Sequence, residues 1–533
     1  MRFFYASMLL LYVLTTQGQT VSTVRLTPSA NPVKTTIKQK AETVAARPRY
    51  VFTEAGGSAA TADRIPFWLG ANQFGIVPTQ SPFGTLRAGA FQDYDSTTYI
   101  YGYKFRRRRV DWGYGIEVVG NVGKTAALLI PEAYLKARLG PFELMAGRRR
   151  EVYGLADTTL GTGSFAISPN ALPIPRVQVS LPQFTPIGFT RGILAFQGVY
   201  AHGWFDDSGP IKGSYLHQKT LYGRLGKETW PIRFYGGFNH QVQWAGRTDI
   251  FTSDKIIKNG RFPSSFSNYI DAVTGASLAA RGTNQDTTLT AEGDRFNRIG
   301  NHLGSIDIGF EINARRYSVL FYRQSFYEDG SLYYLINIAD GLNGIQFRNK
   351  KRRTGHGFRI DKVVAEFLYT KNQGGADFGN LPTNRGNDNY YNHGQYLRGW
   401  SYSGRTLGTP FIPPASTVQT DLPPAYVVGD TKPPYRIFTN NNRVSVLHLG
   451  ASGQFGSRYT FALKCSFSDN LGTYITPFPA STRQLSAFLN ITGPIGHRRD
   501  LLATVSVGAD QGKLYDNSVG AYIGIRKVWA GQP

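Results

Sequence analysis

The segment SIDIGFEINA, residues 305–314, alternates apolar and polar side chains with a period of two. One face is apolar, with Ile306, Ile308, Phe310, Ile312 and Ala314, and the other is polar or small, with Ser305, Asp307, Gly309, Glu311 and Asn313. Successive side chains of a β-strand point to opposite sides of its sheet. The segment therefore predicts a strand with one apolar and one polar face.

The same alternation recurs in VDWGYGIEV (110–118) and YTFALKCSFS (459–468). A soluble β-sandwich also alternates, so the period alone does not decide the class. Strands of about nine to eleven residues suit a tilted crossing of a membrane. Their charged residues fall on the polar face, as a wet lumen requires. Aromatic residues gather at strand ends, such as Trp529 in the last strand, where an interfacial girdle belongs.

Composition points to the same all-β class. The chain has 60 Gly, 31 Tyr and 34 Phe but only 3 Met, a usage typical of closed antiparallel sheets with aromatic girdles. A mean hydropathy of −0.27 argues against a bundle of transmembrane helices, each of which needs about 20 apolar residues. We expect a transmembrane antiparallel β-barrel of about 16–18 strands with a short N-terminal periplasmic or helical segment.

The chain divides into three predicted regions. Residues 1–19 have the charge and apolar run of a signal peptide, which predicts export to the cell outer membrane. Residues 20–62 are rich in Thr, Ala, Pro and Lys and are expected to form a flexible periplasmic lead. Residues 63–533 are assigned to the barrel, with long external loops near 245–300 and 372–442.

The formal net charge of +24 bears on the partners of the protein. Export makes nucleic acid an unsuitable partner, so an acidic surface polysaccharide and the lipid and lipopolysaccharide of the outer membrane are the expected ones. The barrel-insertion machinery is a third expected partner. The alternative is that the basic residues only line the lumen or contact lipid phosphates.

Four segments carry a family resemblance: IPFWLGANQFG (65–75), GRRREVYGLADTTLGTGSFAISPNALPIPRVQV (147–179), EGDRFNRIGNHLGSIDIGFE (292–311) and DNYYNHGQYLRGWSYSGRTLGTPF (388–411). In these the chain resembles the Wzi-like capsule-assembly family of outer-membrane β-barrel proteins. The resemblance implies a large monomeric barrel near eighteen strands with helical elements toward the periplasm. It also implies that the protein retains capsule or exopolysaccharide at the cell surface by a lectin-like, non-catalytic action.

The segment 388–411 is the first candidate binding site. Aromatic rings stack on sugar rings, and guanidinium groups bind carboxylates. On this chemistry the polysaccharide-binding candidates are Tyr390, Tyr391, Tyr396, Arg398, Trp400, Tyr402 and Arg405. The alternative is that this loop folds inward and packs over the lumen.

A second candidate is the run Arg148, Arg149 and Arg150. Arginines bind carboxylates with two parallel hydrogen bonds. These three can hold the anionic groups of an acidic sugar, or they can pair with Glu151, Asp157 and other luminal acids to stiffen a plug. The sequence leaves both interpretations open.

Catalysis, metal binding and cofactors are not expected. No GxSxG motif is present, and His240, His302 and His393 lack the HxH or HExxH spacing of a zinc site. The main rival to polysaccharide binding is an outer-membrane porin or substrate-specific channel. An open lumen would favour the channel, whereas a plugged lumen would favour binding at the surface.

Overall fold

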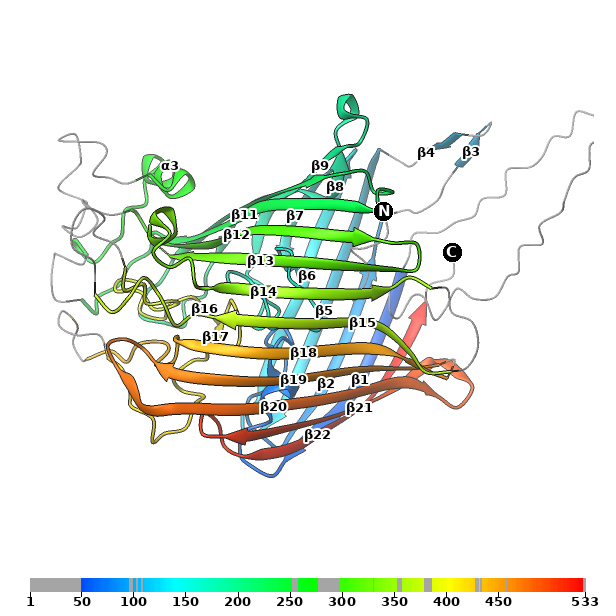
Figure 1. Cartoon of the computed structure of the whole chain (residues 1–533). Coiled ribbons are helices and arrows are strands. Elements are labelled where there is room, and N and C mark those ends of the chain that lie inside the picture. The colour runs from blue at the N-terminus through cyan, green and yellow to red at the C-terminus, as the bar shows by residue number, and fades with distance from the viewer. Residues whose placement is uncertain are drawn as a thin grey trace, which may run out of the picture.

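The computed structural model describes residues 49–94, 99–101, 104–106, 109–251, 257–276, 298–328, 330–351, 357–377, 386–426, 431, 434–456 and 458–530. Within this part of the chain, eighteen strands form one antiparallel sheet (Figure 1). The sheet closes into a barrel because the first strand pairs with the last, from Tyr50 opposite Ala530 to Ala60 opposite Gly520. Closure leaves no unpaired strand edge to face lipid. The prediction of a barrel is confirmed.

The barrel strands are β1 (Arg49–Ala60), β2 (Phe83–Gln92), β5 (Val110–Gly123), β6 (Ala127–Leu139), β7 (Phe142–Arg148), β8 (Arg176–Pro186), β9 (Leu194–Trp204), β10 (Tyr215–Leu225), β11 (Ile232–Trp244), β12 (Asn301–Asn313), β13 (Tyr317–Glu328), β14 (Gly341–Asn349), β15 (Arg359–Tyr369), β18 (Val444–Phe455), β19 (Tyr459–Gly472), β20 (Pro477–Ile495), β21 (Arg498–Gly512) and β22 (Ser518–Ala530).

Short elements lie between these strands. The helices are α2 (Phe67–Gly70) and α3 (Phe266–Thr274), with 3-10 turns η1 (Gly188–Thr190) and η3 (Ser331–Tyr334). Two small hairpins pair β3 (Tyr99–Tyr101) with β4 (Lys104–Arg106), and β16 (Ser401–Tyr402) with β17 (Arg405–Thr406). Among the described residues, no helix has the length and apolarity to cross a membrane.

The strands place apolar residues on the outer wall and polar residues inside the barrel, as the sequence predicts. In β12, Ile306 and Ile308 are exposed on the outer wall, whereas Ser305 and Asp307 are buried inside. Large apolar residues also face outward on other strands, for example Leu86, Leu144 and Leu447. An apolar outer belt and a polar interior are what a barrel needs in order to sit in a bilayer.

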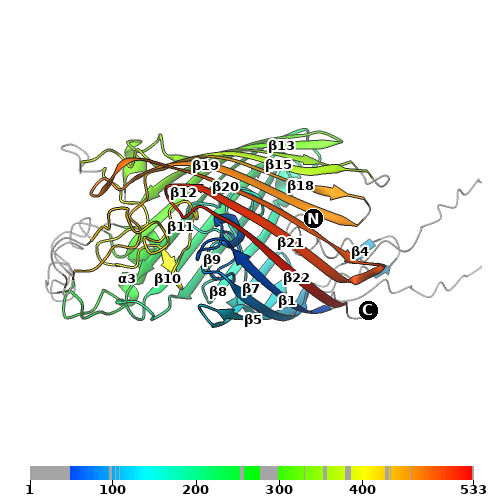
Figure 2. The same ribbon diagram turned by 90° about the horizontal axis from the view of Figure 1, so that it is seen from below.

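The two ends of the barrel differ. Strand β1 begins and β22 ends at one end, which we call the terminus end, and there β20 and β21 are joined by the two residues 496–497. At the opposite end, the loop end, β11 and β12 are separated by residues 245–300, and β15 and β18 by 370–443 (Figure 2). Outer-membrane barrels keep short turns in the periplasm and long loops outside the cell. On this rule the terminus end faces the periplasm.

The boundary expected at residue 62 needs correction, because residues 49–60 form β1 rather than a flexible lead. In β1 the aromatic residues Tyr50 and Phe52 point inward, and the outward positions include Ala55 and Ala59. Val51 is the only large apolar residue on its outer face, so the strand lacks the run of such residues by which other strands were recognised. The expected signal peptide, and the lead up to residue 48, lie outside the described residues.

Three segments pack inside the barrel and together form what we call the plug: 64–82, 149–175 and 388–426. Trp68, Phe165 and Trp400, one from each segment, belong to a single buried cluster that also includes wall residues such as Phe326 of β13. Phe165 stacks on Phe326 with their ring centroids 4.2 Å apart. This cluster is the apolar core of the protein, and it lies toward the loop end of the lumen.

Candidate functional site

The aromatic side chains of segment 388–411 are buried within the plug. Tyr390, Tyr391 and Trp400 have no exposed surface, and Tyr396 and Tyr402 have almost none. The Trp400 indole N–H donates to the carbonyl of Ala166 at 2.6 Å, and the Tyr391 hydroxyl donates to the carbonyl of Phe165. The loop thus adopts the inward arrangement, the second of the two that the sequence allowed.

The two arginines of this segment also serve the plug. Arg405 donates to the carbonyls of Gly70, at 3.3 Å, and Val77, which ties the loop to the segment that follows β1. Burial and the nearby Arg64 lower the pKa of Arg405 to about 10. Arg398 forms an ion pair with Asp206 at 3.3 Å. In this conformation the seven residues have few faces left for a polysaccharide, so their binding role stays a prediction that requires the loop to open.

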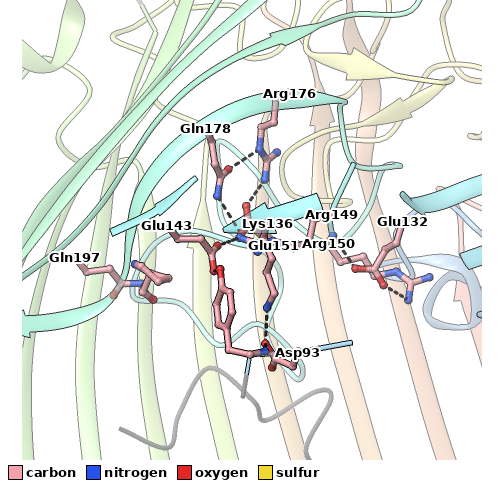
Figure 3. Close-up of polar contacts among 12 residues, drawn as sticks. Asp93, Glu132, Lys136, Glu143, Arg149, Arg150, Glu151, Arg176, Gln178 and Gln197 are labelled. Carbon is pink, nitrogen blue, oxygen red and sulfur yellow. Dashed lines mark hydrogen bonds and ion pairs between the residues drawn. The ribbon is translucent and has the colours of Figure 1, made fainter. Parts of the chain in front are cut away.

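Two arginines of the run, Arg149 and Arg150, meet acidic partners inside the barrel (Figure 3). Arg149 pairs with Glu143 at 2.7 Å and with Glu151. Arg150 pairs with Glu117 at 2.8 Å and reaches Glu132 at 3.5 Å. These contacts match the plug interpretation of the run.

Arg148 has a different role from its two neighbours. It donates to the carbonyl of Ile130 at 2.9 Å and to the hydroxyl of Tyr402 at 2.8 Å. The second contact joins the end of β7 to the hairpin β16–β17 of the plug. Arg148 is therefore a link between the barrel wall and segment 388–411.

A buried ionic network surrounds Glu151 (Figure 3). Arg149 and Arg176 both pair with its carboxylate, and Gln178 accepts from Arg176 at 2.9 Å. Burial alone would raise the pKa of Glu151, but the two arginines outweigh it and lower the pKa to about 2. Opposed charges held this closely fix the start of segment 149–175 against the wall.

Asp157 anchors the same segment to the opposite wall. Its carboxylate pairs with Lys362 of β15 at 2.7 Å and accepts from the backbone N–H groups of Thr159 and Leu160. Burial opposes ionisation, yet these partners hold the pKa of Asp157 well below its ordinary value. Segment 149–175 is thus pinned to β7 and β8 at one point and to β15 at another.

A cavity of about 1200 Å³ occupies the terminus-end part of the lumen, and we call it the vestibule. It is lined by the first residues of β1, the last of β22 and the plug residues 150–159. Arginines and lysines outnumber acidic residues along its lining by ten to seven. A hollow with excess positive charge favours anionic ligands.

Two exposed aromatic residues at the loop end were not predicted from the sequence. Tyr333 is 84% exposed and Tyr334 is 46% exposed, both in η3 between β13 and β14. The adjacent tyrosines in SLYYL break the alternation expected of a strand, which is the signal that could have revealed them. Their ring faces are exposed to solvent, whereas the aromatic rings of segment 388–411 are buried.

Comparison with known proteins gives a family match. A model of the family described as capsule assembly protein Wzi matches residues 89–422, which is more than half of the chain. The matched range includes the plug segments 149–175 and most of 388–426. A search of curated proteins finds no match.

Solved structures provide likenesses at low sequence identity. Wzi of Escherichia coli, described as an outer-membrane protein involved in group 1 capsule assembly and a carbohydrate-binding β-barrel, aligns with a TM-score of 0.52 at 13% identity, covering 89% of this chain and 83% of that one. OccK5 (OpdH) of Pseudomonas aeruginosa aligns at 0.41 and 9% identity, covering 91% and 98%. OccAB4 of Acinetobacter baumannii aligns at 0.42 and 7% identity, covering 91% and 99%. The first of these shows a shared fold.

Proposed function

The chain belongs to the Wzi capsule-assembly family of outer-membrane proteins, and from that membership we propose that it binds and organises capsular or extracellular polysaccharide at the cell surface. The action is non-catalytic: the protein holds the polymer and leaves its bonds intact. The carbohydrate-binding description of the Escherichia coli structure supports this proposal.

The observation that carries the proposal is the plugged loop end of the lumen. Aromatic residues from three segments pack there in one buried cluster, with Trp68, Phe165 and Trp400 fully or almost fully buried. A lumen filled in this way is a poor path for solutes. The described parts of the long loops at the same end then form a platform outside the cell.

The binding surface we propose is centred on Tyr333 and Tyr334. Both rings lie at the loop end and are exposed, and their planes are nearly perpendicular with centroids 5.0 Å apart. Two rings set at this angle can contact successive sugars of a chain that bends across them. The positive charge of the protein, formally +24, steers an acidic polymer toward this surface before the rings engage it.

Polysaccharide retention by cells tests the proposal. A strain that lacks the protein is complemented with the full chain or with the variant Tyr333→Ala/Tyr334→Ala, and the polysaccharide left on washed cells is measured. Loss of two stacking rings, at about 0.5–1.5 kcal/mol each, should lower retention several-fold. The matched control is Phe189→Ala, because Phe189 is 89% exposed but lies at the terminus end.

Equal retention by the tyrosine variant and the unmodified protein would remove these rings from the binding surface. If the strain without the protein also retains polysaccharide normally, the proposed function itself fails.

A further inference from the structure

One part of the vestibule wall concentrates cations that the plug does not use. Strands β10, β11 and β14 bring Arg224, Arg233, Arg348 and the following Lys350 to the terminus end of the lumen, all of them lining the vestibule. The ionic network around Glu151 and the pair Asp157–Lys362 hold the plug. Among the described residues, Arg224, Arg233 and Lys350 have no hydrogen bond or ion pair with the plug, so their position needs another explanation.

Arg224 is the most unusual member of the group. It is only 7% exposed, and within the described part of the chain its guanidinium has no hydrogen-bond or ion-pair partner. Its nearest aromatic neighbour is Phe184, with the ring centroid 5.7 Å from the guanidinium carbon. A buried arginine without an acidic partner costs free energy. Such a cost is understandable if the group is kept for an anionic ligand.

The nearby acid is already engaged by other groups. Glu311 pairs with Arg233 at 2.8 Å and accepts from the Tyr235 hydroxyl at 2.7 Å. Arg233 also donates to the carbonyl of Glu228 at 3.1 Å. Among the described residues, Glu311 forms no ion pair with Arg224 or Lys350. The Lys350 ammonium donates instead to the side-chain oxygen of Asn313 and, at 3.4 Å, to the carbonyl of Ala314.

The environment of Lys350 reflects the same surplus of positive charge. Burial lowers the pKa of Lys350, and repulsion from Arg233 and Arg348 lowers it further, against the opposing effect of Glu311. A bound anion would relieve that repulsion.

Aromatic rings lie beside these cations. Phe184 of β8 and Tyr235 of β11 both line the vestibule and contact each other edge to face, with centroids 5.5 Å apart. Arginine beside aromatic rings is suited to a sugar that carries a carboxylate, because the ring contacts the sugar face and the guanidinium binds the acid. The cavity volume of about 1200 Å³ exceeds the range of about 300–1,000 Å³ usual for small-molecule sites.

We propose that the vestibule is a binding site for a carboxylate-bearing oligosaccharide segment that enters from the terminus end, with Arg224 and Lys350 as the carboxylate-binding groups and Phe184 and Tyr235 as the sugar-contacting rings. This inference rests on the proposed function, since it adds a second contact with the same class of polymer. It assigns the periplasmic side of the barrel a role separate from that of the loop-end surface.

Calorimetry on the purified full chain in detergent tests the proposal. The probes are hexagalacturonate, which carries six carboxylates, neutral maltohexaose, and inorganic tripolyphosphate. Hexagalacturonate should bind and maltohexaose should not. Replacing Arg224 by Gln removes charge-assisted hydrogen bonds of about 1.5–3 kcal/mol, so the variant Arg224→Gln should bind about ten- to a hundredfold more weakly. Lys350→Gln should weaken binding in the same direction.

The matched control is Arg315→Gln, because Arg315 is exposed at the same end but does not line the vestibule. Equal binding of hexagalacturonate by Arg224→Gln and the unmodified protein would overturn the proposal. Equally tight binding of tripolyphosphate would overturn the assignment to a glycan.

The experiment separates this inference from the proposed function. If Arg224→Gln binds normally while Tyr333→Ala/Tyr334→Ala loses surface retention, the vestibule site is rejected and the surface function stands. If hexagalacturonate binds through Arg224 while the strain without the protein retains polysaccharide normally, the site stands and the surface function is rejected.

Discussion

The two halves of the lumen are built from the same strands but have opposite characters. At the loop end, rings from the plug segments pack against one another and against wall residues such as Phe326, and these aromatic side chains are buried. At the terminus end, the same barrel encloses a cavity of about 1200 Å³ lined with arginine, lysine and glutamate. The interior is therefore closed at one end and hollow at the other.

This difference distinguishes charged residues that hold the plug from charged residues that remain available to bind a ligand. Arg149 and Arg150 form ion pairs with Glu143, Glu151 and Glu117, so their task is to hold the plug, although two nitrogens of the Arg150 guanidinium have no hydrogen-bond partner among the described residues. Arg224 has no such partner among the described residues although it lines the same lumen. A basic residue inside a barrel is thus informative about ligands only once its acidic partners are known.

The largest expected effect comes from a substitution that disrupts the packed core at the loop end of the lumen. Trp400→Ala removes a fully buried indole and its hydrogen bond to Ala166, at a cost of about 3–5 kcal/mol. Hydrogen exchange of the backbone amides in 161–168 and 388–411 should accelerate strongly, because both segments lose the same packing partner. Trp400→Phe is the control and should restore much of the protection. Unchanged exchange in the alanine variant would mean that the plug does not depend on this core.

A smaller effect is expected at the ionic anchor of the plug. Glu151→Gln leaves Arg149 with Glu143 and Arg176 with Gln178, so we expect a loss of about 1.5–3 kcal/mol in the local stability of segment 149–160. Because the pKa of Glu151 is lowered to about 2, its contribution is complete above the unfolded value near 4.5 and is lost as the pH falls toward 2. The protection factor of this segment, which is its exchange rate relative to the intrinsic rate at each pH, should fall between pH 6 and pH 3 more in the unmodified protein than in the variant. An equal fall in both would exclude Glu151 as the anchor.

The smallest expected effect concerns the vestibule, the hollow half of the lumen. It tests whether the charge of Lys350 there contributes to ligand binding. Because burial, Arg233 and Arg348 lower the pKa of Lys350, this residue loses its charge at a lower pH than an ordinary lysine. Affinity for hexagalacturonate should therefore fall about two- to fourfold between pH 7 and pH 10. Lys350→Arg should remove most of this decline, since arginine keeps its charge throughout. The same decline in both proteins would show that another group is responsible.

The sequence predicted the barrel wall well and its interior poorly, for a physical reason. Contact with lipid imposes an apolar outer face on β5, β12 and β19, so their alternation is visible in the chain itself. Strand β1 escaped notice because its large residues, Tyr50 and Phe52, point inward and its outward side includes the small residues Ala55 and Ala59.

The plug was harder to predict because a loop that packs inside a lumen has the composition of one that faces a ligand. Tyrosine, tryptophan, asparagine and arginine, which recur in segment 388–411, are suited both to packing inside a lumen and to binding a ligand. What distinguishes them is close packing that only the fold reveals. Gly399 has a φ of +57°, and a Cβ there would collide with the carbonyl oxygen of Tyr391. The sequence named the arginines of 148–150 but could not say whether acids or sugars would meet them.

Single-channel conductance of the purified full chain in a planar bilayer tests the central claim most directly, with and without an acidic polysaccharide. The closed loop end predicts little or no steady conductance under either condition. A large, steady conductance would contradict the account, because it would require a continuous water path through the core formed by Trp68, Phe165 and Trp400, and the protein would then be a channel.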